Sequence, residues 1–185
     1  MVKKEKLLSL IDENIIAILL VVLAVFTRLI PHPANFAAVG AVALFSGTYL
    51  NKKYALWLPL AAMMVSDAII GLHNLIFFTW GSFILISFIG LWVRGRKNVK
   101  NVVFGTLTGS LLFYFITNGA VWAFTPLYAK TFQGMLECYV MGLPFFRGTV
   151  LGDFFYVGVL FGGYEAVRYF LPQLKERLSA VKVRA

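Results

Sequence analysis

The sequence predicts an all-α membrane protein, a bundle of six transmembrane helices that forms a single domain over residues 1–185. The first observation is composition: 60% of the 185 residues are hydrophobic, 14% are charged, and the mean hydropathy is +0.82. A soluble domain is roughly half apolar and a quarter charged. The second observation is that the apolar residues form blocks, most of them near the ~20 residues that cross a bilayer as a helix. The third is the distribution of basic residues between these blocks.

Six blocks are the expected spans: about 14–30, 36–50, 54–72, 75–93, 101–124 and 148–171. The first follows Lys3, Lys4 and Lys6. Because no small-residue cleavage site comes after it, we interpret it as a retained helix and not as a signal peptide. The second is short, at roughly 22 Å of helix for about 15 residues, which indicates a tilted or broken helix. The third tolerates Pro59 in its first turns.

Between the last two spans lies the segment 125–147, which is too polar to cross and contains Gly134, Gly142 and Pro144. We expect it to form an outer lid.

Basic residues orient the chain, because cytoplasmic loops are enriched in lysine and arginine. With both termini in the cytoplasm, 14 of the 17 lysines and arginines face inward, and only Arg28, Lys130 and Arg147 face outward. The net charge of +9 is therefore a topology signal, with a possible role at anionic lipid headgroups, and does not indicate nucleic acid.

This orientation collects polar residues at one outward depth. Ionisable groups at membrane depth cost roughly 2.5–3.5 kcal/mol each on insertion scales, so they persist when they pair or line a cavity. A polar pocket that opens outward is the interpretation we prefer, with the aromatic residues of the set stacking on a flat ligand. The candidate substrate-binding residues are Arg28, His32, Asn35, Asp67, His73, Trp80, Asn118, Trp122, Tyr139, Arg147 and Asp153.

Simpler interpretations stay open for each of them. The two arginines can reach outward to lipid headgroups, or they can form structural pairs with the two aspartates. His32 can be an exposed loop residue. An interfacial aromatic belt is the alternative for at least half of the outward aromatic residues, which are Trp80, Trp122, Tyr128 and Tyr139.

Small residues in the second span suggest a helix interface. Ala37 and Ala41, and likewise Ala43 and Gly47, are spaced so that another helix can approach closely, within the fold or from a partner. Motifs for ATP binding or catalysis are missing, and neither histidine has a second metal ligand nearby. Cys138, the single cysteine, excludes an internal disulfide. The sequence thus supports no enzyme, no metal site and no intrinsic cofactor.

Five stretches carry a resemblance: RLIPHPANF, LPLAAMMVSDAIIG, ITNGAVW, CYVMGLPFFRGTVLGD and FYVGVLFGG. They resemble a family of small bacterial six-helix membrane proteins that is itself similar to the S components of energy-coupling-factor vitamin transporters, including the solitary cobalamin transporters. The resemblance implies an inner-membrane protein that binds a vitamin in an outward pocket under flexible loops. It also implies docking on a T component with two ATPases, and cobalamin as the leading candidate for the transported ligand.

The chain departs from this family in two ways. The small-residue docking face is typical of the first helix there, whereas Ala37 and Ala41 lie in the second span. The cobalt-ligating cysteine of the solitary type has no counterpart in residues 74–84, although Asp67 and Arg147 match the aspartate and arginine of that site, and His32 or His73 can replace the thiolate. The alternative function is a non-transporting membrane scaffold with a related six-helix bundle, in which the outer polar residues are structural pairs.

Overall fold

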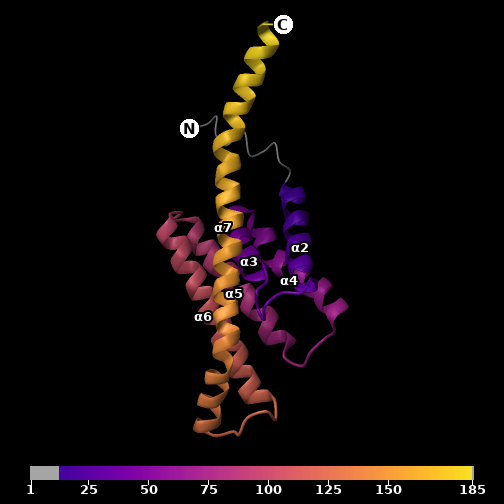
Figure 1. The fold of residues 1–185 in the computed structure, drawn as a ribbon, viewed down its shortest axis with the longest axis vertical. Helices are drawn as coiled ribbons and strands as arrows, with labels where there is room; N and C mark the ends of the chain where they lie inside the picture. Colours follow the sequence, from indigo (N-terminus) through magenta and orange to yellow (C-terminus); the bar gives the residue numbers. More distant parts are fainter. Residues whose placement is uncertain (1–12, 185) are drawn as a thin grey trace.

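The computed structural model describes residues 13–184, without the side chains of 171, 172 and 174–184. This part of the chain is all-helical, with six helices joined by short turns (Figure 1). Their bounds are α2 Glu13–Leu29, α3 Val39–Tyr49, α4 Lys52–Ile70, α5 Ile76–Arg94, α6 Val99–Phe124 and α7 Phe132–Arg184. Lys3, Lys4 and Lys6, which contribute to the expected orientation, lie outside the described residues.

Four of the described helices are long and apolar enough to cross a membrane: α4, α5, α6 and the part of α7 from Phe132 to Phe170. Their outer faces carry many exposed large hydrophobic side chains, among them Trp57, Phe77 and Phe104. In water such faces would be costly to expose, whereas lipid tails solvate them without penalty. The described chain therefore has the surface of a membrane protein.

The short helix α3 is the centre of the bundle. It packs against each of the five other described helices, and every residue from Val39 to Thr48 is buried. A helix that is apolar all round is expected in such a position. Its 11 residues are too few to span a bilayer alone, so α3 depends on the longer helices around it.

Small residues allow α3 to lie directly against α5. A β-carbon on Gly47 would overlap the Ser87 carbonyl oxygen, and one on Gly90 would overlap the Leu44 carbonyl oxygen. Ala41 and Ala43 are fully buried, at 0% exposure. The predicted partner interface of Ala37, Ala41, Ala43 and Gly47 is therefore corrected: the last three pack inside this chain, and Ala37 is half-buried beside a cavity.

The first five helices begin and end within three residues of an expected span. The sixth differs, because α7 starts at Phe132 and includes most of the segment expected to be a lid. Gly134 and Gly142 allow this helix to pack closely against the neighbouring chain. A β-carbon on Gly134 would overlap the Ala129 carbonyl oxygen, and one on Gly142 would overlap the Asn118 side chain. Pro144 removes one N–H from the helix ladder, a loss that helices in membranes tolerate. Only residues 125–131 remain as a connection between α6 and α7.

The bundle has two distinct ends. We call the end with the turns 30–38, 71–75 and 125–131 the hairpin end, and the end where α7 finishes the tail end (Figure 1). At the tail end, Arg94 donates from Nε to the Gly47 carbonyl oxygen at 3.0 Å and also bonds the Leu50 carbonyl. These bonds satisfy carbonyls at the C-terminus of α3 that have no partner within the helix.

Candidate functional site

The turn 30–38 at the hairpin end is held in one conformation. Asn35 adopts a left-handed backbone with φ of 60°, a conformation that asparagine accepts better than most residues. The Ala38 N–H donates to Thr27 Oγ1 at 3.1 Å. Helix α7 lies directly on this turn, because a β-carbon on Gly148 would overlap the Ala34 carbonyl oxygen. The two prolines thus restrict a turn that its neighbours also fix.

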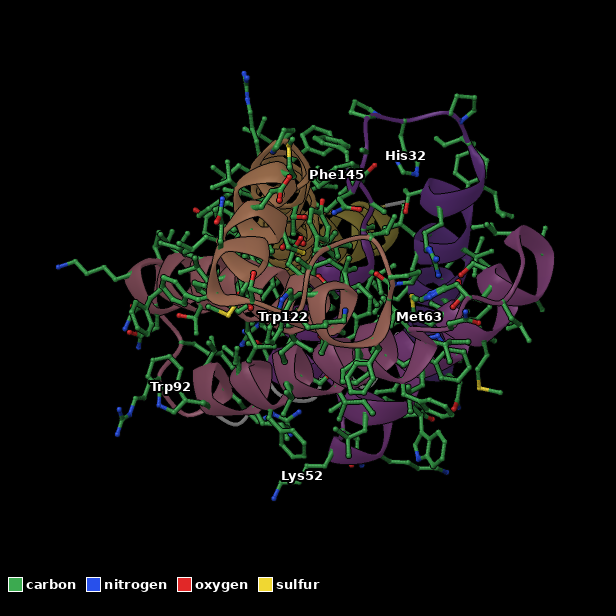
Figure 2. The ribbon with its side chains drawn as sticks, turned by 90° about the horizontal axis from the view of Figure 1, so that it is seen from below. His32, Lys52, Met63, Trp92, Trp122 and Phe145 are labelled. Atoms are coloured by element: carbon green, nitrogen blue, oxygen red, sulfur yellow. The ribbon has the colours of Figure 1, made fainter. Side chains whose placement is uncertain are left out.

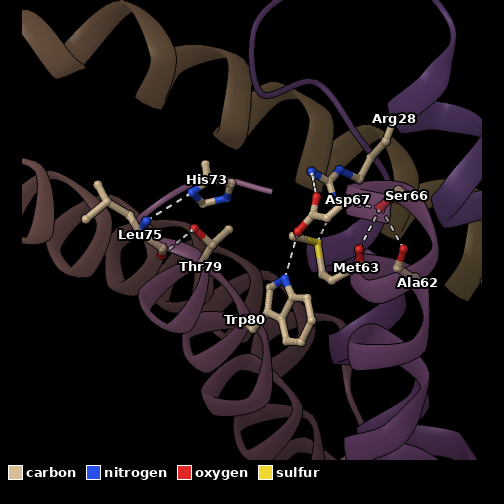
Figure 3. A network of polar contacts seen from close by, with 9 residues as sticks. All are labelled: Arg28, Ala62, Met63, Ser66, Asp67, His73, Leu75, Thr79 and Trp80. Atoms are coloured by element: carbon tan, nitrogen blue, oxygen red, sulfur yellow. Dashed lines mark hydrogen bonds and ion pairs between the residues drawn. The ribbon is translucent and has the colours of Figure 1, made fainter. Parts of the chain in front are cut away.

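Arg28, on the last turn of α2, is the hub of a polar network (Figure 3). Its Nη2 lies 2.6 Å from Asp67 Oδ1 on α4. Its Nη1 donates to Ser66 Oγ at 2.6 Å and contacts Met63 Sδ at 2.9 Å. The network therefore joins α2 firmly to α4.

Asp67 is saturated by its partners. Its second oxygen, Oδ2, accepts a hydrogen bond from Trp80 Nε1 on α5 at 2.8 Å, and its side chain is 1% exposed. A buried carboxylate with a guanidinium on one oxygen and an indole N–H on the other needs no further ligand. Of the alternatives left open by the sequence, the structural pair with an arginine is the one that Asp67 forms.

A cavity of about 320 Å³ lies beside this network. His32 and Asn35 are exposed, whereas Asp153 is buried, so the cavity opens at the hairpin end and closes toward the middle of the bundle. Figure 2 looks at this end and shows His32 on the arc of chain that joins α2 to α3. The lining residues are Arg28, His32, Asn35, Ala37, Val39, Gly40, Met63, Ile70, Thr79, Phe83, Ile86, Phe113, Thr149 and Asp153.

Asp153, on α7, forms the floor. It is 7% exposed, and its Oδ2 accepts a hydrogen bond from Ser110 Oγ on α6 at 2.7 Å. Its other oxygen sits over Gly40 of α3, where a β-carbon would overlap Oδ1. Within residues 13–170, Asp153 takes part in no ion pair, since the two that are present join Arg28 to Asp67 and Arg168 to Glu165.

The hydrogen bonds of the two histidines assign their tautomers. His32 Nδ1 lies 2.7 Å from the Pro33 carbonyl oxygen, which can only accept, so Nδ1 carries the proton and Nε2 is left as an acceptor at the rim. His73 has the opposite arrangement, because its Nδ1 accepts from the Leu75 N–H at 3.3 Å. His73 caps the start of α5 and does not line the cavity.

The structure thus brings together four of the predicted binding residues, Arg28, His32, Asn35 and Asp153, around one cavity. Asp67 and Trp80 lie behind Arg28 as its support. Four others do not reach the cavity lining: Asn118, Trp122, Tyr139 and Arg147. No lining residue comes from the segment 125–147 either.

Three of those four join the end of α6 to the start of α7. Trp122 Nε1 donates to the Ala129 carbonyl oxygen at 3.0 Å, and Tyr139 Oη donates to the Phe115 carbonyl oxygen at 3.0 Å. The Asn118 carbonyl oxygen accepts from Cys138 Sγ at 3.3 Å. Arg147 is exposed on α7. Asn118, Trp122 and Tyr139 thus hold the α6–α7 hairpin together, and a ligand contact by these residues or by Arg147 stays a prediction.

Sequence reasoning missed the residues that complete the cavity. Thr149 lines the cavity one helical turn from Asp153, and Phe83, Ile86 and Phe113 form the wall. Ser110 does not line the cavity but bonds Asp153. Ser110 and Thr106 are four residues apart, and both are buried on one face of α6, a small polar pair that could have pointed to the partner of Asp153. The wall residues carry no such signal, because apolar residues are typical of every membrane helix.

Across the described chain, no group of three histidine, cysteine or acidic residues could hold a metal ion.

Residues 9–174 match the model of a family of unknown function, DUF6580. No curated protein gives a significant match, and no solved structure does. The family match covers α2 to α6 and α7 as far as residue 174, including the turn 30–38, the Arg28–Asp67 pair and the Asp153 floor. This chain, whose cavity is lined by residues of all six described helices, belongs to the family of unknown function DUF6580.

Proposed function

We propose that the protein is a multi-pass protein of the bacterial cytoplasmic membrane that binds a small nutrient, a vitamin, and takes part in its uptake. The observation that carries the proposal is the cavity of about 320 Å³, with polar residues at its rim and floor and an apolar wall between them. Cavities of small-molecule sites are of this kind: mostly apolar, with a few placed polar groups that set orientation.

The hairpin end is the outer end in this proposal. Of the described basic residues, that end holds only Arg28, Lys130 and Arg147, and the charge of Arg28 is offset by Asp67. The tail end holds Lys52, Lys53, Arg94, Arg96, Lys97, Lys100 and Arg168. An excess of lysine and arginine marks the cytoplasmic side, so both termini are cytoplasmic and the cavity opens outward.

Uptake proceeds by capture at the outer mouth followed by reorientation of the protein in the bilayer. The segment 125–147 has no part as a lid here, because none of its residues lines the cavity. A T component with ATPases stays part of the proposal as the source of energy. It would dock on a face other than Ala41 and Gly47, since both are buried inside the chain.

The cavity size bears on the substrate. A volume of about 320 Å³ is at the lower end of the range for small-molecule sites, roughly 300–1,000 Å³. A vitamin of one or two rings fits such a volume. Cobalamin, which the resemblance suggests, would have to leave most of its corrin ring outside, so we favour a smaller vitamin and keep cobalamin as a candidate to test.

The test is ligand-induced thermal stabilisation in detergent, with a panel of cobalamin, riboflavin, biotin, thiamine, pyridoxine and pyridoxamine. A ligand that binds only the folded state at 100 times its Kd adds about 2.7 kcal/mol to the free energy of unfolding. We expect at least one vitamin to raise the unfolding midpoint, and native mass spectrometry of freshly extracted protein to show the same mass adduct.

The matched variants are Asp153→Ala at the cavity floor and Arg147→Ala, an exposed position on the same helix. Stabilisation and growth on limiting vitamin should be lost in the first and kept in the second. If no vitamin stabilises the protein and Asp153→Ala leaves growth unchanged, uptake is excluded and the alternative, a non-transporting membrane scaffold, is supported.

A further inference from the structure

The floor of the cavity contains a carboxylate oxygen without a partner. Asp153 Oδ2 accepts from Ser110, but no hydrogen bond reaches Oδ1 within the described chain. Every side-chain nitrogen or oxygen that is fully enclosed in this part of the protein does have a partner. Oδ1 therefore keeps accessible surface, and Asp153 is 93% buried and lines the cavity together with Gly40, which lies against Oδ1.

The described residues therefore provide no spare positive charge for an ionised carboxylate in this cavity. Its ionisable lining residues are Arg28, His32 and Asp153. The guanidinium of Arg28 is offset by Asp67 at 2.6 Å, and His32 donates from Nδ1 to a carbonyl at the exposed rim. The Asp153 carboxylate is left without a counter-charge from the described residues, deep in a site where water screens charges poorly.

The position of Asp153 has a cost in free energy. A buried carboxylate without a cation is expensive, and packing alone does not need it, because a neutral asparagine would accept the Ser110 hydrogen bond equally well. Gly40 leaves room for the carboxylate, as any side chain there would overlap Oδ1. The floor thus has room for a carboxyl group whose ionised form lacks a cation partner, and a bound cation would favour that form.

The wall above this floor is apolar and partly aromatic. The rings of Phe83 and Phe113 lie 5.1 Å apart between centroids, and Ile86 and Met63 complete the surface around them. Such a wall suits the flat body of a small ring compound. A ligand that satisfies both features carries an apolar ring and one positive charge.

We propose that Asp153 is the anchor for a protonated amine or other cationic nitrogen, so that the cavity selects small ring compounds with a single positive charge. This inference rests on the proposed function and specifies the substrate class of the same site. Ser110 positions the carboxylate from below, and the cationic nitrogen replaces water on Oδ1. Charge-assisted hydrogen bonds of this kind are about twice as strong as neutral ones.

The experiment compares pairs of probes that differ only in charge. Pyridoxamine and pyridoxine share a ring and differ by an amine in place of a hydroxyl group, and benzylamine and benzyl alcohol form a smaller second pair. Binding is measured to the wild-type protein in detergent by isothermal calorimetry at pH 7. We expect the amine of at least one pair to bind tenfold or more tightly than its alcohol, which corresponds to about 1.4 kcal/mol.

Variants then locate the source of the preference. Asp153→Asn keeps the size of the side chain and should remove the preference for the amine. Glu137→Gln makes the same acid-to-amide change at an exposed position of α7 away from the cavity, and should keep it. The wild-type comparison needs no variant, so a poorly folded Asp153→Asn protein would not prevent the test.

The outcomes separate this inference from the proposed function. If a vitamin binds but neither amine is preferred over its alcohol, or if Asp153→Asn keeps the preference, the inference is overturned while the proposed function stands. If no vitamin and no probe binds, both fail.

Discussion

Two buried aspartates have opposite surroundings. Asp67 on α4 has a guanidinium on one oxygen and an indole N–H on the other. Asp153 on α7 has one serine hydroxyl and an oxygen that faces a cavity. Both are almost fully buried, at 1% and 7% exposure. The difference teaches that burial of an acidic side chain does not by itself mark a binding residue. The number of partners that its two oxygens have within the protein must be known as well.

The largest effect on stability is expected at Asp67. In Asp67→Asn the Arg28 guanidinium loses its counter-charge while it stays largely buried, at 18% side-chain exposure. Breaking a buried pair from one side costs about 3 kcal/mol. The unfolding midpoint in detergent, measured by differential scanning fluorimetry, should fall by several degrees.

Removal of both charges is the control for that loss. The double variant Arg28→Met with Asp67→Leu leaves no uncompensated ion and should recover most of the stability. The unpaired Trp80 N–H would then account for a remaining cost of about 1 kcal/mol. A double variant less stable than Asp67→Asn alone would contradict the structural role of the pair.

Gly40→Ala is expected to have the next largest effect. Its β-carbon would overlap Asp153 Oδ1, so the carboxylate must move from the floor, at a packing cost of about 2 kcal/mol. Ligand-induced stabilisation should be lost as well. Gly81→Ala on α5 is the matched control, because a β-carbon there meets nothing within 4 Å; equal losses in both variants would show that the space above Gly40 has no special role.

A smaller effect is expected at the α6–α7 hairpin. Trp122→Phe removes the hydrogen bond to the Ala129 carbonyl at 3.0 Å and keeps most of the ring, so the loss should be about 1 kcal/mol in thermal unfolding. Binding of any ligand should be unchanged, since Trp122 does not line the cavity. A loss of affinity without a loss of stability would place Trp122 back among the binding residues.

The smallest effect is expected at Arg147. It is exposed on α7 and away from the cavity, so Arg147→Ala should change stability by no more than about 0.5 kcal/mol. Uptake of the vitamin, measured with radiolabelled substrate in cells, should equal that of the wild type. Reduced uptake at normal expression would restore the role that the family resemblance gave this residue.

Hydropathy predicted the position of most helices because each apolar block is bounded by charged or turn residues. It failed at the start of α7, where Gly134, Gly142 and Pro144 suggested a broken segment. Glycine weakens a helix in water mainly through backbone entropy and exposure. In α7 the glycines instead create room for Ala129 and Asn118, and this advantage depends on the neighbouring chain segment, which local sequence cannot reveal.

The cavity lining was predictable only in part, because the sequence gives the depth of a side chain in the membrane but not its direction. A shared depth brought Arg28, His32, Asn35 and Asp153 into one set, and they do surround one cavity. Depth does not specify the direction in which a side chain points around its helix, so Asn118, Tyr139 and Arg147 were included as well. The sequence left structural pairing open for both aspartates, and only the packing of α2 against α4 decided it for Asp67.

The central claim is that Asp67 holds the bundle together whereas Asp153 holds the ligand. The most direct test is to prepare Asp67→Asn and Asp153→Asn side by side and to record thermal unfolding of each in detergent, first without and then with the best ligand of the vitamin panel. We predict that Asp67→Asn unfolds earlier than the wild type without ligand. Asp153→Asn should unfold within about 1 kcal/mol of the wild type, since it loses a charge that was uncompensated, and should gain nothing from the ligand. A strong loss of unliganded stability in Asp153→Asn, together with a normal ligand-induced shift, would contradict the claim.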